Sequence, residues 1–361
     1  MKSIPNIAVI GCGYWGPNLI RNFNSLPGCN VKIACDLEED RLIHMKSLYP
    51  GVEITTEFER VIDSSEIDVI AIATPVRFHF EMAQKSLLAG KHTFIEKPMA
   101  SSAAECSELI EIAESKNLTL IVGHTFIYSP PVRKIKELIS RNALGDIQYI
   151  SSRRLNLGLF QPDINVAWDL APHDISIILY VMDLAPHSVN CQGKAHINPE
   201  IEDVTSMVLN FDNGCFGTIQ SSWLDPNKIR EMTFVGSKRM LVYNDLEPTE
   251  KIKIYDKRVE APPHYDTFAE FHYSYHYGDM YSPYLKQYEP LKKECQHFLD
   301  CITTGAKPES GGDVGLKVVE ILEAASESLK RGGAKVEISE IARRNLNWND
   351  KSNEIKPAQA L

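Results

Sequence analysis

The chain has 361 residues, a length that fits about two domains rather than a single core. Its composition, 43% hydrophobic and 24% charged, is typical of a globular protein, and its net charge of −10 argues against nucleic acid or anionic membrane as a general partner. No apolar run approaches the roughly 18 residues of a membrane span and no signal peptide fits before the first strand, so we expect a cytoplasmic protein.

The first predicted strand, Ile7 to Ile10, ends in the loop Gly11-Cys12-Gly13-Tyr14-Trp15-Gly16, and a segment with helical spacing follows. This order of strand, glycine loop and helix is the context of a dinucleotide-binding fingerprint. The first glycine would permit a tight turn, the second would let the backbone approach a pyrophosphate, and the third would let the helix pack on the strand. The diphosphate would then bind the N–H groups at the start of the helix. The pattern predicts that the chain binds a nicotinamide dinucleotide.

A second strand, residues 31–35, ends at Asp36, where an acidic residue would accept a hydrogen bond from a ribose hydroxyl. The same carboxylate would repel a 2′-phosphate, which Arg41 would offset only in part. We therefore expect NAD rather than NADP as the cofactor.

The rest of the first third alternates helix and strand. The predicted helices cover residues 38–48, 58–63, 78–89 and 103–116, and the strands cover 52–54, 69–73, 93–95 and 119–122. Continuous β-branched runs suit strands that are buried on both faces of a parallel sheet. We predict an α/β fold whose first domain, residues 1–124, is a doubly wound parallel sheet.

The motif Glu96-Lys97-Pro98 follows the strand at 93–95, at the strand end where ligands bind in such sheets. An ammonium near a bound cofactor can stabilise a developing alkoxide. Lys97 is therefore a candidate catalytic residue, and a surface lysine in a loop is the alternative.

From about residue 146 the strands follow one another with fewer helices between them. They cover residues 147–155, 189–196, 203–211, 215–222, 230–235, 240–243 and 251–255, and a helix at 169–182 interrupts the series. Residues 261–290 are predicted to be irregular, helices follow at 290–303 and 313–331, and residues 341–361 form a polar tail. We predict an α+β substrate-binding and oligomerisation domain, residues 125–340, with an open, mostly antiparallel sheet. Apolar residues at 207–209 and 215–219 suggest a homodimer or homotetramer formed through its uncovered face.

Asp169 and His173 are four residues apart, so they share one face of the predicted helix. A histidine oriented by a carboxylate can act as a general base. Because Pro172 suits a first helical turn, Asp169 would lie at or near the N-cap, and a cap with a packed histidine is the alternative. Asp174 is expected to be structural.

No metal site is predicted. Only His272 and His276 have ligand-like spacing, and no carboxylate or cysteine completes a set near them. The eight cysteines include no C-x-x-C pair, which suits reduced, buried thiols.

Together these motifs resemble the Gfo/Idh/MocA family of sugar and polyol oxidoreductases, over nearly the whole chain. The resemblance rests on the glycine loop, Ala73-Thr74-Pro75 with His79, Glu96-Lys97-Pro98, Asp169-x-x-x-His173, and Cys301 to Gly305 before the late helix. It implies a Rossmann-type first domain and a catalytic trio of Lys97, Asp169 and His173, with His173 accepting the hydroxyl proton.

The resemblance also implies that Thr74, Pro75, His79 and Glu96 line the nicotinamide. The full set of expected cofactor contacts is Gly11, Gly13, Tyr14, Trp15, Gly16, Asp36, Arg41, Thr74, Pro75, His79, Glu96 and Lys97. The expected substrate contacts are Lys97, His124, Tyr128, Arg154, Asn156, Asp169 and His173. One departure is Ile127, which stands where many members carry an arginine.

The glycine-loop and Asp169 regions look most like members that oxidise C3 of a UDP-linked N-acetylamino sugar in surface-polysaccharide biosynthesis. Arg154 and Asn156 share one face of a strand, where Arg154 would hold a diphosphate or be a surface charge. The alternatives are a dehydrogenase of a free sugar or cyclitol, a keto-sugar reductase, and an NAD-binding regulatory protein.

Overall fold

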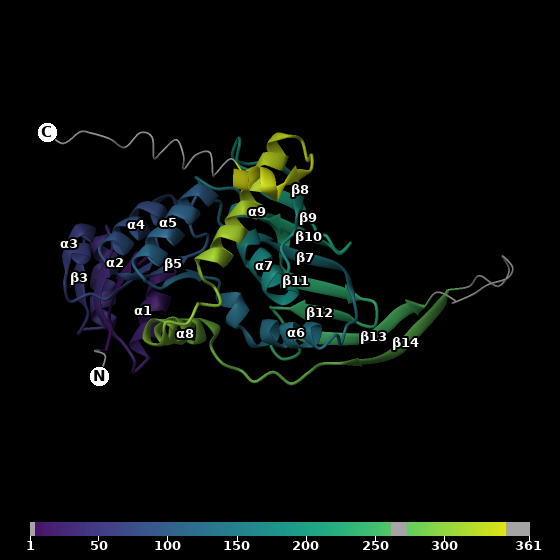
Figure 1. Ribbon diagram of the computed structural model, residues 1–361, viewed down its shortest axis with the longest axis horizontal. Helices are drawn as coiled ribbons and strands as arrows, with labels where there is room; N and C mark the ends of the chain where they lie inside the picture. Colours follow the sequence, from purple (N-terminus) through teal and green to yellow (C-terminus); the bar gives the residue numbers. More distant parts are fainter. Residues whose placement is uncertain (1–3, 261–272, 344–361) are drawn as a thin grey trace. The chain divides into compact units, whose positions relative to one another are not determined.

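The computed structural model describes residues 4–260 and 273–343, which form two compact units (Figure 1). The first unit takes its described residues from Met1–Tyr128, Tyr288–Glu323 and Glu340–Leu361. The second takes them from Ser129–Gln287 and Ala324–Ser339. Among these residues, no helix combines the length and apolar character needed to cross a bilayer.

The first unit is built on a six-stranded sheet in the order β3-β2-β1-β4-β5-β6. All neighbouring strands run parallel, which confirms the predicted doubly wound arrangement. Its strands are β1 (Asn6–Ile10), β2 (Asn30–Cys35), β3 (Glu53–Thr55), β4 (Val69–Ile72), β5 (His92–Glu96) and β6 (Leu120–Gly123).

Helices from both ends of the chain cover this sheet. They are α1 (Gly16–Asn24), α2 (Glu39–Leu48), α3 (Phe58–Asp63), α4 (His79–Leu88), α5 (Ala103–Ser115), α8 (Pro290–Thr304) and the first part of α9 (Gly312–Lys330), with short 3-10 turns η1 (Val76–Phe78) and η2 (Thr125–Tyr128). Figure 1 shows α8 beside α1. The ring centroid of Phe94 in β5 lies 6.1 Å from that of Phe23 in α1 and 5.9 Å from that of Phe298 in α8.

The observed units differ from the predicted domains, which were divided after residue 124. Leu291, Cys295 and Phe298 of α8 belong to the same buried cluster as Ile7 and Phe94. α8 and the start of α9 therefore complete the core of the first unit, although the sequence analysis assigned residues 125–340 to the second domain.

The second unit is built on a nine-stranded sheet in the order β14-β13-β12-β11-β7-β10-β9-β8-β15. β7 and β10 pair in parallel and the other pairs are antiparallel, so the sheet is mostly antiparallel as predicted. The strands are β7 (Ile147–Leu157), β8 (Ser188–Lys194), β9 (Val204–Asn210), β10 (Phe216–Ser222), β11 (Leu224–Gly236), β12 (Met240–Asn244), β13 (Ile252–Glu260), β14 (Ser274–Tyr281) and β15 (Val336–Glu337).

Three elements of this unit were not predicted, namely β14, α6 and the two-residue strand β15. Residues 274–281 form β14, which pairs with β13, so the segment 261–290 is not irregular throughout, and residues 261–272 lie outside the described residues. Helix α6 (Pro130–Ser140) occupies a stretch for which the sequence analysis predicted no element.

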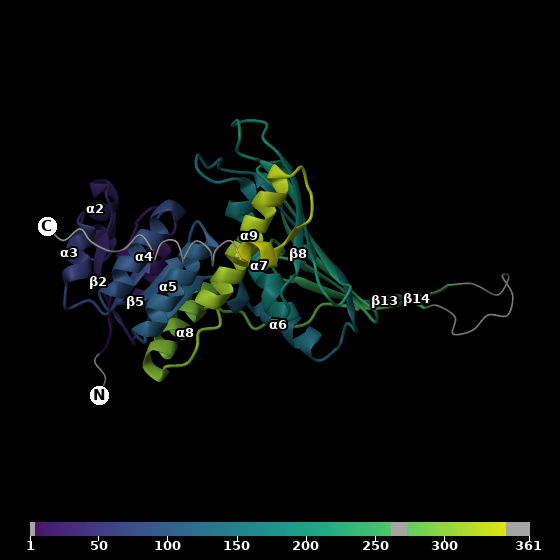
Figure 2. The ribbon, with the colours of Figure 1, turned by 45° about the horizontal axis from the view of Figure 1, so that its top comes forward.

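Helix α7 (Val166–Met182) packs on β7, β9 and β10, and α6 packs on α7. Figure 2 shows both helices on one face of the sheet. Met207, Leu209 and Ile219 are buried in this layer, because they point from the sheet toward the helices. The sequence analysis had placed these residues on an uncovered face. On the outer face, Ser206 and Gln220 are exposed, and so are Phe216 of β10 and the Tyr149 ring stacked on it, so this face carries both polar and apolar residues. A homo-oligomer stays a prediction.

We predict that Phe298→Ala lowers the free energy of unfolding by roughly 3–5 kcal/mol, because it leaves a cavity beside Phe94 in the core of the first unit. Chemical denaturation measures the change, with Lys293→Ala, an exposed site on the same helix, as the control. Equal costs for the two variants would show that α8 is not part of this core.

Candidate functional site

The glycine loop has no room for side chains at two of its positions. Gly11 has a φ of +91°, and a Cβ there would lie 2.6 Å from the carbonyl oxygen of Ala73. A Cβ at Gly16 would lie 1.8 Å from the carbonyl oxygen of Gly11. The first turn of α1 carries no acidic residue and no side-chain cap, so its positive end faces the loop uncompensated. This is the arrangement that binds a diphosphate.

Asp36 lies beside the loop at the end of β2 and is almost fully buried. Its Oδ2 accepts the backbone N–H of Cys12 at 2.6 Å, and its Oδ1 accepts that of Glu38 at 2.9 Å. The guanidinium of Arg41 lies 3.5 Å from Oδ1. The loop, Asp36 and Arg41 thus gather at one place, where Asp36 keeps acceptor capacity for a ribose hydroxyl.

His79 links the segments that follow β4 and β5. Its ring nitrogens lie 2.7 Å from the carbonyl oxygen of Thr74 and 2.8 Å from that of Pro98. Burial lowers the pKa of His79, although both carbonyls oppose that shift, so the neutral ring donates to only one of them. His79 was predicted to line the cofactor. Since it is buried, we assign it the role of fixing Thr74 and Pro98.

Lys97 follows β5 directly and is half-buried, and its peptide bond to Pro98 is cis. The preceding residue, Glu96, is buried with its carboxyl group against Gly123 of β6, where a Cβ would lie 2.8 Å from Oε1. Burial raises the pKa of Glu96 to about 7, against the opposing effects of the Lys97 charge, the Lys97 N–H and the Trp15 indole.

Two of the predicted substrate contacts lie inside the first unit. His124 is fully buried, and burial together with the Lys97 charge lowers its pKa to about 3, so the ring is neutral. Tyr128 is also fully buried, with its hydroxyl 3.0 Å from the Ser310 hydroxyl. We therefore assign Tyr128 to packing rather than to substrate. Ile127 is buried beside it.

In the second unit, α7 begins earlier than predicted. Its N-cap is Asn165, whose side chain accepts the N–H of Trp168 at 3.2 Å, so Asp169 is not the cap and Pro172 lies inside the helix. The indole N–H of Trp223 instead donates to Oδ2 of Asp169 at 3.1 Å. Trp223 is buried and thereby orients the carboxylate, one helical turn before the half-buried His173.

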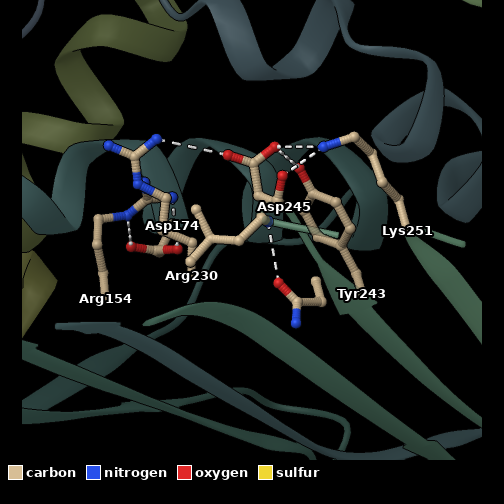
Figure 3. Close-up of polar contacts among 8 residues, drawn as sticks. Arg154, Asp174, Arg230, Tyr243, Asp245 and Lys251 are labelled. Atoms are coloured by element: carbon tan, nitrogen blue, oxygen red, sulfur yellow. Dashed lines mark hydrogen bonds and ion pairs between the residues drawn. The ribbon is translucent and has the colours of Figure 1, made fainter. Parts of the chain in front are cut away.

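Arg154 is buried in an ion pair, contrary to both alternatives that the sequence left open. Its Nε and Nη2 donate to Asp174 at 2.7 and 3.1 Å, and Ser152 donates to the same carboxylate at 2.9 Å. The pair, drawn in Figure 3, ties α7 to β7, and Asp174 directly follows His173 in the chain. It is neither a surface charge nor a diphosphate ligand, and Asp174 is structural as expected. Asn156, two residues along the same face of β7, is half-buried.

Figure 3 also shows a second polar group near this pair, centred on Asp245. Tyr243 donates to its carboxylate at 3.1 Å, and Arg230 and Lys251 each lie 3.5 Å from it. Arg230 of β11 and Lys251, which directly precedes β13, thus share the single negative charge of Asp245.

Three residues of these sites were missed. Trp223 and Asn165 carry no local signal that would connect them with Asp169. The third, Glu294 of α8, is buried, and its carboxylate accepts the Thr125 hydroxyl at 2.7 Å. It does carry a local signal, because it shares helical spacing with Leu291, Cys295 and Phe298 and so faces the core. Within the described ranges no three His, Cys, Asp or Glu side chains gather as metal ligands, and His276 contacts Asp256 at 3.1 Å.

Known proteins share both units. A profile described as the oxidoreductase family with an NAD-binding Rossmann fold matches residues 5–124, and one described as the GFO/IDH/MocA C-terminal domain matches residues 132–242. Myo-inositol 2-dehydrogenase of Thermotoga maritima is 23% identical over 90% of this chain and 96% of its own. UDP-N-acetylglucosamine 3-dehydrogenase of Acidithiobacillus ferrooxidans is 28% identical over 55% of this chain and 62% of its own.

Solved structures agree on the fold. The structure of that UDP-N-acetylglucosamine 3-dehydrogenase superposes with a TM-score of 0.74 at 22% identity, covering 91% of this chain and 98% of its own. An oxidoreductase from Agrobacterium radiobacter, crystallised with NAD+, L-tartaric acid and magnesium, gives a TM-score of 0.77 at 19% identity, covering 94% and 100%.

We expect Asp36→Ala to narrow the preference for NAD over NADP by roughly tenfold or more, because a charged hydrogen-bond acceptor and a repulsive charge are both lost. NAD affinity falls the more, since the N–H of Cys12 also loses its acceptor. Binding of the two cofactors is measured against Asp40→Ala, an exposed neighbour. A native protein that bound NADP as tightly as NAD would contradict the assignment.

The Arg154–Asp174 pair yields a stability prediction. Arg154→Met leaves a buried carboxylate uncompensated and should cost about 3–5 kcal/mol of unfolding free energy. The control is Arg153→Met on the same strand, whose partner Glu231 lies 2.7 Å away in a much more exposed pair, and its cost should stay below about 1 kcal/mol. Similar costs in denaturant titrations would refute the burial argument.

Proposed function

Because the chain belongs to the GFO/IDH/MocA family of NAD-binding oxidoreductases, we propose that it oxidises a secondary alcohol of a sugar. The proposal rests on one observation above all: Lys97 extends from the carboxyl end of β5, in the same sheet whose β1 leads into the glycine loop. Ligands of doubly wound sheets bind at those strand ends. NAD, when bound, supplies the hydride acceptor.

We assign the proton chemistry to His173. Its Nδ1 is buried, which leaves Nε2 as the ring nitrogen that takes the proton from the reacting hydroxyl. Asp169, held by Trp223 one turn earlier on α7, favours the protonated imidazole. The Lys97 ammonium stabilises negative charge on the substrate oxygen.

For the substrate we propose a UDP-linked N-acetylamino sugar, oxidised at C3 in surface-polysaccharide biosynthesis. The resemblance of the glycine-loop and α7 sequences supports this class, and so does the similarity to a UDP-N-acetylglucosamine 3-dehydrogenase. Arg154 does not support a diphosphate-linked substrate, because its guanidinium is already paired with the Asp174 carboxylate. A free cyclitol is the second candidate, since the similarity to a myo-inositol 2-dehydrogenase extends over most of the chain.

The substrate class is tested by a panel of UDP-sugars, free sugars and inositols with NAD+, followed by the absorbance of the reduced cofactor. The proposal expects reduction with a UDP-N-acetylamino sugar and not with inositol. Reduction with inositol alone would replace it by the cyclitol assignment, and NAD binding without turnover of any compound would favour a regulatory protein.

We predict that Lys97→Ala and His173→Ala each lower turnover by roughly 10²–10⁴-fold, the usual scale for a positioned acid–base group. NAD affinity should change little, because neither residue belongs to the glycine loop. Thermal stability is measured on the same His173 variant, with His44→Ala at an exposed site as the control. A variant with lower stability and unchanged turnover would make His173 a packing residue.

A further inference from the structure

Two glutamates are buried in the first unit without full hydrogen bonding. Glu96 ends β5 and is 9% exposed, and Glu294 in α8 is fully buried. In each of them Oε1 finds no hydrogen-bond partner among the described residues. Buried polar atoms of native proteins almost always have a partner, so two such carboxyl oxygens call for an explanation.

Both carboxyl groups contact the same short segment, residues 123–125. The carboxyl group of Glu96 packs on Gly123, and Oε2 of Glu294 accepts the hydroxyl of Thr125 at 2.7 Å. His124 stands between these two contacts, buried, and neither ring nitrogen has a partner in the described part of the chain. The two glutamates also act on each other through space, since the Glu96 charge adds to the effect of burial in raising the pKa of Glu294.

Little positive charge compensates this pair. Lys97 favours the charged form of Glu96, and the Trp15 indole N–H does so weakly, without a hydrogen bond of standard geometry. On α8 the neighbouring Cys295 is a buried thiol whose pKa burial raises well above its usual value.

The other charged groups near these elements are paired, neutral or, as with Lys292 and Lys293 of α8, exposed to solvent. Arg21, on the α1 face that meets α8, pairs with Glu289 at the start of α8. His124 is neutral because burial lowers its pKa. Two ionised carboxylates would therefore repel each other across a buried site, and the arrangement favours one negative charge.

We propose that Glu96 and Glu294 share one proton at neutral pH and that the oxidised cofactor displaces this proton as it binds, so that rising pH favours NAD+ over NADH. The inference rests on the proposed function, because it takes the nicotinamide ring to lie at the end of β5 near Glu96. The displaced proton goes to solvent, and no bond other than O–H is broken.

The direction follows from charge. The nicotinamide ring is positive in NAD+ and neutral in NADH, and a nearby positive charge lowers the pKa of a carboxyl group. A ligand that releases a proton on binding binds more tightly as pH rises, by at most about tenfold per pH unit for one proton. As pH rises through the range in which the pair loses its last proton, NAD+ affinity should therefore rise and NADH affinity should stay constant.

The test is the number of protons released when NAD+ or NADH is titrated into the protein at about pH 7, from calorimetry in two buffers of different ionisation heat. Wild type should release a fraction of a proton with NAD+ and none with NADH. Glu294→Gln keeps the side-chain shape but removes the negative charge that favours a proton on Glu96, so Glu96 should be more ionised and the variant should release less. Glu111→Gln, at an exposed site on α5, should match wild type. Equal release from wild type and Glu294→Gln would assign the proton to another group and overturn the proposal.

A second measurement needs no variant. With ¹³C-labelled glutamate, a carboxyl titration of the cofactor-free wild type should show one glutamate still protonated near about pH 7. If every glutamate carboxyl is ionised there, the pair does not hold a proton and the inference fails.

Proton release linked to NAD+ without turnover of any sugar would reject the proposed function and retain the pair. Sugar oxidation with equal proton release for NAD+ and NADH would retain the proposed function and reject the proton-sharing pair.

Discussion

The first unit depends on a close backbone approach between β1 and α1. Because a Cβ at Gly16 would lie 1.8 Å from the Gly11 carbonyl oxygen, α1 can start directly against the strand only with glycine at that position. From this start, α1 brings the ring centroid of Phe23 to within 6.1 Å of that of Phe94 in β5. Phe94 in turn packs against Phe298, which fixes α8. The loop that would bind a diphosphate is thus part of the same constraint that builds the core.

Buried charges are treated in three ways in this protein. Asp36 accepts two backbone N–H groups, and Arg154 and Asp174 form an ion pair. Glu96 and Glu294 are less fully compensated: Glu96 accepts one backbone N–H, that of Lys97 at 3.3 Å, and lies beside the Lys97 charge, and Glu294 accepts, among the described residues, only the Thr125 hydroxyl. The Arg154–Asp174 pair serves structure, whereas a weakly compensated pair beside a candidate catalytic lysine is what a site that responds to the charge of its ligand requires.

Much of the fold could be predicted because its signals are local. Apolar β-branched runs and the glycine loop specify the parallel sheet, and the spacing of Asp169 and His173 places them on one helix face. Apart from the missed elements α6, β14 and β15, the failures involve partners that are distant in sequence. The place of α8 in the first core depends on its contact with Phe94, and the burial of Arg154 depends on Asp174. The orientation of Asp169 by Trp223 likewise joins two segments that no local pattern relates.

The proposed chemistry is hydride transfer from a sugar carbon to the nicotinamide, with the proton leaving through His173. The most direct measurement uses a UDP-N-acetylamino sugar that carries deuterium at C3, incubated with NAD+ and followed by mass spectrometry of the cofactor after the protein is denatured. The account predicts reduced cofactor that carries the deuterium. Reduced cofactor without deuterium, or deuterium retained in the sugar product, would contradict it.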